Sequence, residues 1–154
     1  MTTTTTTTGT RAYKGSCRCG AIRFEAELDL SQGTTRCNCS FCTKSGWWGF
    51  LARPAAFRLL AGSDSIVNLG TSPVADRPRC KVCGIEAFGH GDLPELGGEY
   101  YAINVRCLDD VDLAGVPVRY LDGRHDTWAE LAVEPYIDPF VGAGAPGLKP
   151  AWES

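Results

Sequence analysis

The stretch "CRCGAIRFEAEL", residues 17–28, places two thiols in a glycine-containing turn directly before a run of alternating apolar and charged residues. From Ile22 onward an apolar side chain stands at every second position, with arginine or glutamate between. This period of two predicts a half-buried strand over residues 21–28. The same order, a thiol turn followed by a strand, returns at Cys80 and Cys83. We therefore expect a fold organised around two thiol turns.

Other segments alternate in the same way or are rich in β-branched and aromatic residues. The further predicted strands cover residues 12–16, 47–52, 57–62, 65–70, 85–90, 99–105 and 116–121. We expect 57–62 and 65–70 to pair as a hairpin, and Pro117 to place its strand at a sheet edge. Residues 40–44 and 126–132 favour short helices. The fold class is therefore mainly β, in small antiparallel sheets.

Length and charge limit the classes of protein to consider. The chain has 154 residues and a net charge of −3, which suits one globular domain and offers no basic field for nucleic acid. No apolar run approaches the roughly 18 residues of a membrane span, and the threonine-rich start lacks the features of a secretory signal. We expect a disordered tail over residues 1–10, a domain over 11–135 and an irregular Gly/Pro-rich tail over 136–154. The expected location is the cytoplasm, with no nucleic-acid or membrane partner.

Eight cysteines are the most informative feature of the composition. They could form four disulfides in a secreted protein, but they are clustered, and neighbours two positions apart rarely satisfy disulfide geometry. Thiolates that hold a metal in a reducing compartment explain the clustering better. They stand at positions Cys17, Cys19, Cys37, Cys39, Cys42, Cys80, Cys83 and Cys107.

Spacing divides these thiols into two groups. The pairs Cys17-x-Cys19 and Cys80-x-x-Cys83 are each followed by glycine, and together they supply the four ligands of a closed structural zinc site. The alternative for either pair alone is two buried apolar thiols.

The remaining cluster, "CNCSFC" at residues 37–42, supplies three ligands from one short segment. Three protein ligands and one open position are typical of a catalytic zinc, so Cys37, Cys39 and Cys42 are the candidate catalytic group. Two alternatives close the site instead: Cys107, or one thiol of the Cys80 pair, could act as a fourth ligand.

Four ordered motifs resemble one known family. They are "GSCRCGAIRFE" (15–25), "CNCSFCTKSG" (37–46), "CKVCGIEAF" (80–88) and "INVRCLDD" (103–110), and "LDGRHDTW" (121–128) adds a C-terminal match. These motifs resemble the glutathione-dependent formaldehyde-activating enzymes, also called the Gfa or centromere-protein-V-like family.

The resemblance implies a Mss4-like fold and two zinc ions per chain. Cys17, Cys19, Cys80 and Cys83 would bind the structural zinc, and the triplet at 37–42 the catalytic one. The implied activity is reversible addition of glutathione to formaldehyde, which in reverse is a carbon–sulfur lyase reaction. The alternative is a zinc-stabilised module that binds glutathione or a protein without turnover.

Substrate contacts are predicted from the chemistry of glutathione and of the aldehyde. Glutathione carries two carboxylates, so Lys44 beside the triplet and Arg106 are the predicted cationic contacts. Trp47 is the predicted pocket wall. His90 and His125 are candidate proton carriers, because histidine titrates near neutral pH.

Overall fold

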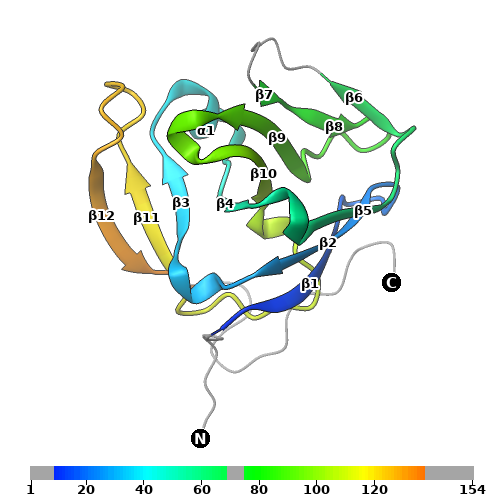
Figure 1. The fold of residues 1–154 in the computed structure, drawn as a ribbon, viewed down its shortest axis with the longest axis horizontal. Helices are drawn as coiled ribbons and strands as arrows, with labels where there is room; N and C mark the ends of the chain where they lie inside the picture. The colour runs from blue at the N-terminus through cyan, green and yellow to red at the C-terminus, as the bar shows by residue number, and fades with distance from the viewer. Residues whose placement is uncertain (1–8, 69–74, 138–154) are drawn as a thin grey trace, which may run out of the picture.

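The computed structural model describes residues 9–68 and 75–137, which form short strands joined by turns (Figure 1). The strands are β1 (Arg11–Ser16), β2 (Arg23–Leu28), β3 (Thr34–Cys37), β4 (Gly49–Ala52), β5 (Phe57–Ala61), β6 (Ile66–Asn68), β7 (Ala75–Asp76), β8 (Pro78–Cys80), β9 (Phe88–Leu93), β10 (Gly98–Asn104), β11 (Pro117–Leu121) and β12 (Glu130–Pro135). The helices are α1 (Ser40–Ser45) and 3₁₀ turns at Leu30–Gln32, Pro54–Ala56, Pro94–Leu96 and Val105–Cys107. The fold is mainly β, as the sequence predicts.

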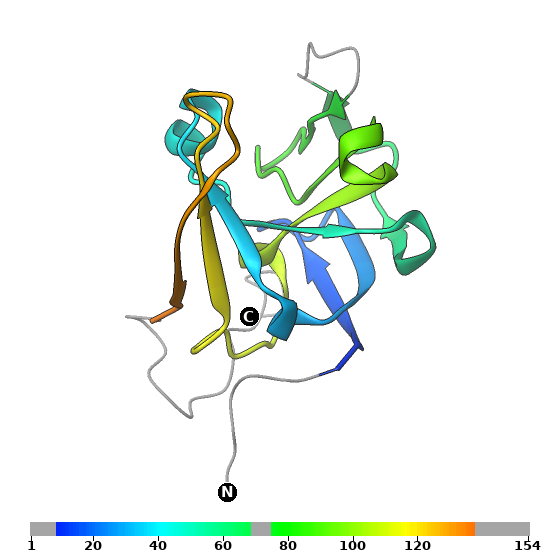
Figure 2. The ribbon, with the colours of Figure 1, turned by 60° about the vertical axis from the view of Figure 1, so that its left-hand side comes forward.

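The strands of the described residues form three sheets. Their orders are β1-β2-β5, β12-β11-β3-β4-β10-β9-β7 and β6-β8. Neighbouring strands are antiparallel except β3 and β11, which run parallel. Figure 2 shows β1 and β2 (blue) on one side of the molecule, while β3, β11 and the loop after β11 rise together on the other side.

Aromatic side chains from two sheets form the centre of the core. Phe24 of β2 and Phe57 of β5 stack with ring centroids 5.6 Å apart. The Phe57 ring continues onto Phe88 of β9 at 5.0 Å and onto Tyr101 of β10 at 4.2 Å. Because Phe24 is fully buried, the alternation seen in residues 21–28 directs β2 toward this cluster.

A buried hydrogen-bond chain ties together the strands that lead to the cysteine triplet. Trp48 is 1% exposed, and its indole N–H donates to Thr34 Oγ1 at the start of β3. Thr34 Oγ1 in turn donates to the Pro117 carbonyl of β11 at 2.8 Å. Satisfied polar groups in a dry core fix their geometry, so β3 reaches its end at Cys37 with a defined position.

Two predicted pairings are wrong. Strands β5 and β6 do not form a hairpin, since β5 pairs with β2 and β6 pairs with β8. Gly62 explains the change of direction: its φ is 101°, and a Cβ there would lie 2.4 Å from the Ala21 carbonyl oxygen. Pro117 is not on an edge strand either, because β11 lies between β12 and β3. As the first residue of its strand, Pro117 is tolerated there.

One of the two predicted helices is confirmed and the other is wrong. Residues 40–44 lie in α1, whereas residues 126–132 turn and then enter β12. Asp126 and Trp128 have φ values of 58° and 57°, which a right-handed helix excludes. The strand predicted at 85–90 begins later, at Phe88, because the Ile85 carbonyl closes the preceding thiol turn.

Parts of the predictions fall outside the described residues. These are residues 1–8 and 138–154, which hold most of the two predicted tails, and residues 69–70 of the strand predicted at 65–70. The domain limits at 11 and 135 therefore stay predictions. Over the described part of the chain, no helix has the length and apolar character that a membrane crossing requires.

Candidate metal centre and adjoining pocket

Two backbone turns of the same design carry the first four thiols. In each, the first cysteine, Cys17 or Cys80, donates its N–H to the carbonyl five residues later at 3.0 Å. The glycine of each turn, Gly20 or Gly84, has a φ of 81°. Glycine adopts this left-handed conformation without the steric penalty of a Cβ, so the spacing of thiols and glycine specifies the turn.

The turns bring four sulfurs together. The Sγ atoms of Cys17, Cys19, Cys80 and Cys83 lie within 4.8 Å of one another. The Cys19 sulfur is 3.7 Å from that of Cys17 and 3.6 Å from that of Cys80. Tetrahedral zinc with Zn–S bonds of about 2.3 Å separates its ligands by roughly 3.8 Å. The donor type and the spacing therefore fit a zinc ion.

Burial and hydrogen bonds shift the pKa values of two of these thiols, Cys17 and Cys83, in opposite directions. Burial raises the pKa of Cys17 to about 12. Burial also acts on Cys83, but N–H donors from Ile85 and Cys19, with the neighbouring thiols, outweigh it and lower the pKa of Cys83 to about 6. The thiolate form of Cys83 is thus favoured near neutral pH, and a bound cation would favour the thiolate form of every ligand.

The second cluster lies where β3 runs into α1. Cys37 ends β3, Cys39 is the N-cap residue of α1, and Cys42 lies in its first turn. Their sulfurs lie within 4.8 Å of one another, and all three residues are partly exposed. The Cys39 N–H donates to the Cys37 sulfur at 3.4 Å, and the Cys42 N–H donates to the Cys39 sulfur at 3.3 Å.

These contacts distinguish the thiols of the triplet from one another. Burial raises the pKa of Cys42. Burial also acts on Cys39, but the Cys42 N–H and thiol outweigh it, and the pKa of Cys39 falls below its ordinary value. The short backbone turn at the start of α1 therefore favours the thiolate form of Cys39.

The triplet has three sulfurs and, among the described residues, no fourth. Cys107 belongs to neither cluster. Burial, with Asp109 and the Cys17 thiol, raises the pKa of Cys107 to about 12, so this residue lies near the first cluster. Cys80 and Cys83, the other candidate fourth ligands, are members of that first cluster. Three cysteine donors with one coordination position left open match catalytic zinc sites.

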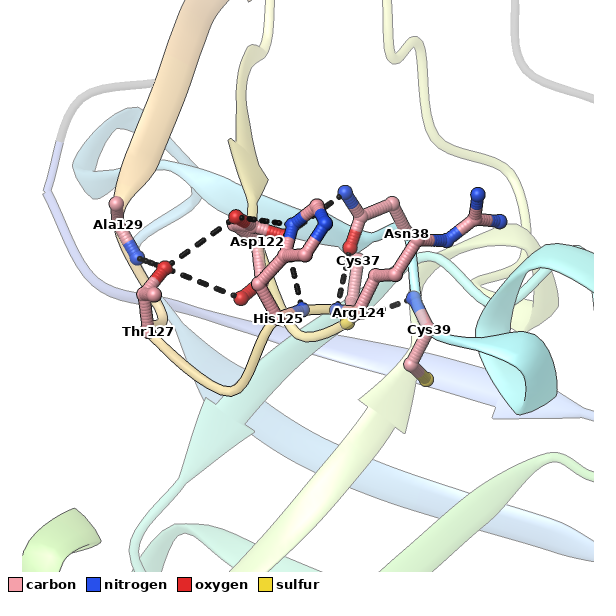
Figure 3. A network of polar contacts seen from close by, with 8 residues as sticks. All are labelled: Cys37, Asn38, Cys39, Asp122, Arg124, His125, Thr127 and Ala129. Atoms are coloured by element: carbon pink, nitrogen blue, oxygen red, sulfur yellow. Dashed lines mark hydrogen bonds and ion pairs between the residues drawn. The ribbon is translucent and has the colours of Figure 1, made fainter.

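The loop between β11 and β12 lies against the triplet segment (Figure 3). Asn38, between two of the thiols, donates from Nδ2 to Asp122 Oδ1 at 3.1 Å and accepts from the Arg124 N–H at 2.8 Å. Asp122 also lies 2.9 Å from the ring Nδ1 of His125 and accepts from Thr127 Oγ1 at 3.3 Å. His125 is thereby placed as a partner of Asp122.

Gly123 of this loop lies directly against a sulfur. A Cβ at Gly123 would come within 2.4 Å of Cys37 Sγ and 3.0 Å of the Trp128 ring. Only a hydrogen fits between the loop and Cys37, so the loop limits where this sulfur can move.

A pocket of about 160 Å³ adjoins the triplet at Cys42. Trp47 lines it, together with the titratable or charged side chains Asp76, Arg77, Glu86, His90 and Tyr100. The Arg77 guanidinium carbon lies over the Phe41 ring of α1, 3.7 Å from its centroid. The pocket therefore combines a cation, two carboxyls and an imidazole beside one thiol of the triplet.

Three side chains were predicted to contact substrate, and the structure places them differently. Trp47 lines the pocket. Lys44 is exposed in the last turn of α1, and Arg106 donates to the Tyr136 hydroxyl at 2.7 Å and lies over the Trp48 ring. Neither of these two cations lines this pocket. Their roles in substrate binding stay predictions.

Sequence reasoning missed Arg77 and Glu86 as pocket residues. Arg77 follows β7, a two-residue strand with no periodic signal, and comes to the pocket through pairing of β7 with β9. Glu86 carried one signal, an acidic residue in an otherwise apolar segment three positions after Cys83. His90, which was considered, lines the pocket.

Single substitutions should separate the two clusters. Cys80→Ser should give largely unfolded protein, because the binding energy of a structural metal is folding energy. Cys39→Ser should lose one zinc and keep a near-native fold, because its segment is partly exposed. Zinc content and circular dichroism measure both effects, with Cys107→Ala as the control that keeps two zinc ions. Complete unfolding of Cys39→Ser would assign the triplet a structural role.

Gly123→Ala should weaken metal binding at the triplet by about 10- to 100-fold, the usual range for disturbing the groups that orient ligands. The added methyl group displaces the Cys37 sulfur, while the metal-free protein can rotate that side chain away. Competition with a zinc chelator measures the affinity. Thr127→Ala, which loosens the same loop without touching a sulfur, is the control. Equal losses in both variants would contradict steric displacement.

Comparison with known proteins agrees with this geometry. Residues 12–124 match the family described as glutathione-dependent formaldehyde-activating enzyme. The fold is similar to the crystal structure of a Rhodobacter sphaeroides protein solved as a structural genomics target, with a TM-score of 0.55 and 31% identity. That match covers 64% of this chain and 90% of the other. Because the family match spans most of the chain and both thiol clusters, the chain belongs to the glutathione-dependent formaldehyde-activating enzyme family.

Proposed function

We propose that this protein is a zinc-dependent enzyme of the carbon–sulfur lyase type that adds glutathione, or a similar thiol, reversibly to formaldehyde. One observation carries the proposal: a partly exposed triplet of cysteines, one ligand short of a closed zinc site, borders a pocket that holds its own cation and carboxyl. Family membership supports the choice of thiol and aldehyde.

Both clusters fit zinc by donor type and spacing. In this proposal Cys17, Cys19, Cys80 and Cys83 hold a structural ion, and the triplet holds a catalytic one. When bound, the ion at the triplet supplies a Lewis acid that lowers the pKa of a thiol or polarises a carbonyl.

The proposed reaction forms one bond and moves one proton. The thiol sulfur bonds to the carbonyl carbon, the carbon–oxygen π bond breaks, and the proton that leaves sulfur ends on oxygen. The product is S-(hydroxymethyl)glutathione, and the reverse reaction breaks the carbon–sulfur bond. Neither direction oxidises or reduces the thiol or the aldehyde. The reaction therefore needs a proton carrier and a binding site, and no redox partner.

Arg77 is the pocket residue best suited to a carboxylate of glutathione. Its guanidinium lies over the Phe41 ring and its side chain is 40% exposed, so N–H donors remain available. Trp47 supplies an apolar wall to the same pocket. Lys44 and Arg106 are kept as proposed contacts for the parts of the substrate that extend beyond the pocket.

A cytoplasmic location is part of the proposal. All eight cysteines are free thiols, although several lie close enough for sulfur–sulfur contact. Thiols in such clusters stay reduced and ready for metal in a reducing compartment.

Exchange spectroscopy by NMR on glutathione mixed with formaldehyde tests the activity directly. The zinc-loaded protein should raise the exchange rate above the spontaneous one, and Cys39→Ser should not. Cys107→Ala, with both clusters intact, should behave like the wild type. Saturable glutathione binding without faster exchange would refute the enzyme and support the binding module.

Arg77→Ala should raise KM for glutathione by about 10- to 100-fold, since a hydrogen bond to a charged group contributes about 1.5–3 kcal/mol. With 2-mercaptoethanol, a thiol without carboxylates, the KM of the same variant should match that of the wild type. Lys44→Ala and Arg106→Ala provide the comparison with the other predicted cations. Equal losses with both thiols would show that Arg77 only maintains the shape of the pocket.

A further inference from the structure

Glu86 is a buried carboxyl that lines the pocket beside the triplet. Its side chain is 5% exposed, and its Oε1 atom has no hydrogen-bond partner among the described residues. Leaving such an atom unsatisfied costs free energy, so a buried unpaired carboxyl oxygen calls for an explanation. An interaction between this carboxyl and a ligand in the pocket is such an explanation.

Two arginines face this carboxyl without neutralising it through hydrogen bonds. Arg77 Nη1 lies 4.0 Å from Glu86 Oε2, and Arg79 Nη2 lies 3.7 Å from Oε1. Burial raises the pKa of Glu86 above its ordinary value, and the two guanidinium groups offset only part of the rise. Glu86 therefore exchanges its proton closer to neutral pH than an exposed carboxyl does.

The other titratable groups around Glu86 are already engaged or fully protonated. His90 Nε2 is 2.7 Å from Glu99 Oε2, and its Nδ1 is 3.7 Å from Asp76 Oδ2. Burial, with nearby acidic groups that include Glu86, raises the pKa of Cys107 to about 12, so this residue stays a neutral thiol. Among the buried side chains of the pocket, Glu86 is thus the group with a free oxygen.

Glu86 lines the same pocket as Cys42 of the triplet. Gly89 of β9 also lines it and presents no side chain there. The pocket volume leaves room for a thiol and a small aldehyde, or for one bridging water. A general acid or base needs such reach before its pKa matters.

We propose that Glu86 carries the proton of the reaction. When the thiol binds, the Glu86 carboxylate takes up the proton that leaves its sulfur. The thiolate then attacks the carbonyl carbon, the carbon–oxygen π bond breaks, and Glu86 returns the proton to the aldehyde oxygen. The reverse reaction uses the same steps backwards, so the carboxylate is regenerated in either direction. This inference rests on the proposed function for its substrates, but not for the proton uptake itself.

Glu86→Gln tests the proton transfer with a side chain of the same shape. The variant should keep two zinc ions and a native circular dichroism spectrum, while the exchange rate falls by about 100-fold or more. The limb of the pH–rate profile that rises with pH should disappear, since that limb reports deprotonation of Glu86. Glu99→Gln, which removes the partner of His90 instead, is the matched control and should keep the limb.

Two results would overturn the proposal. An exchange rate within about 3-fold of the wild type, below the usual contribution of general acid–base catalysis, would show that Glu86 carries no proton. Loss of zinc in Glu86→Gln would make Glu86 a structural residue.

Infrared difference spectroscopy on the wild-type protein gives a readout that needs neither turnover nor a variant. Adding glutathione alone should increase the carbonyl band of a protonated carboxyl, and ¹³C-labelling of glutamate should shift that band. If exchange is not accelerated but this band grows, the proposed function fails while proton uptake by Glu86 stands. If exchange is accelerated and no glutamate band changes, the function stands and the role of Glu86 is refuted.

Discussion

The four-thiol cluster is the interaction on which the rest of the structure depends. It joins the turn before β2 to the turn before β9, with Cys19 and Cys80 separated by 61 positions in the chain. Closing a loop of that length costs chain entropy, and metal binding by four thiolates can offset it. Cys17 and Cys80 are members of the same core as Phe24 and Phe88, so the cluster also fixes how two sheets meet.

The same cluster positions the pocket. After Cys83 the chain needs several residues to complete its turn before β9 can begin at Phe88. Glu86 falls in this interval, where the backbone is not yet paired with β10, although Asn104 holds its carbonyl at 2.9 Å. A carboxyl three positions after Cys83 is thereby buried at the pocket that adjoins the triplet.

Residue patterns predicted an element correctly where residues close together in the chain determine its conformation. The period of two in β2 and the apolar run in β10 became strands, and the short segment at 40–44 became α1 with Cys39 as its cap. The failures concern partners distant in the chain. Gly62 sends β6 away from β5 because the first thiol turn lies against it, and the two left-handed residues after Asp122 exclude the helix predicted there.

The sequence by itself determined the division of the thiols, since the positions of cysteine and glycine specify two turns and one compact triplet before any strand pairs. Tertiary structure alone decided which charged groups share the pocket. The pairing of β7 with β9 brings Arg77 to the pocket, and Glu86 is buried in the segment just before β9 and lines the same pocket. Lys44 lies near the triplet in sequence yet points to solvent, because contacts between distant strands, and not neighbours along the chain, determine what lines a pocket.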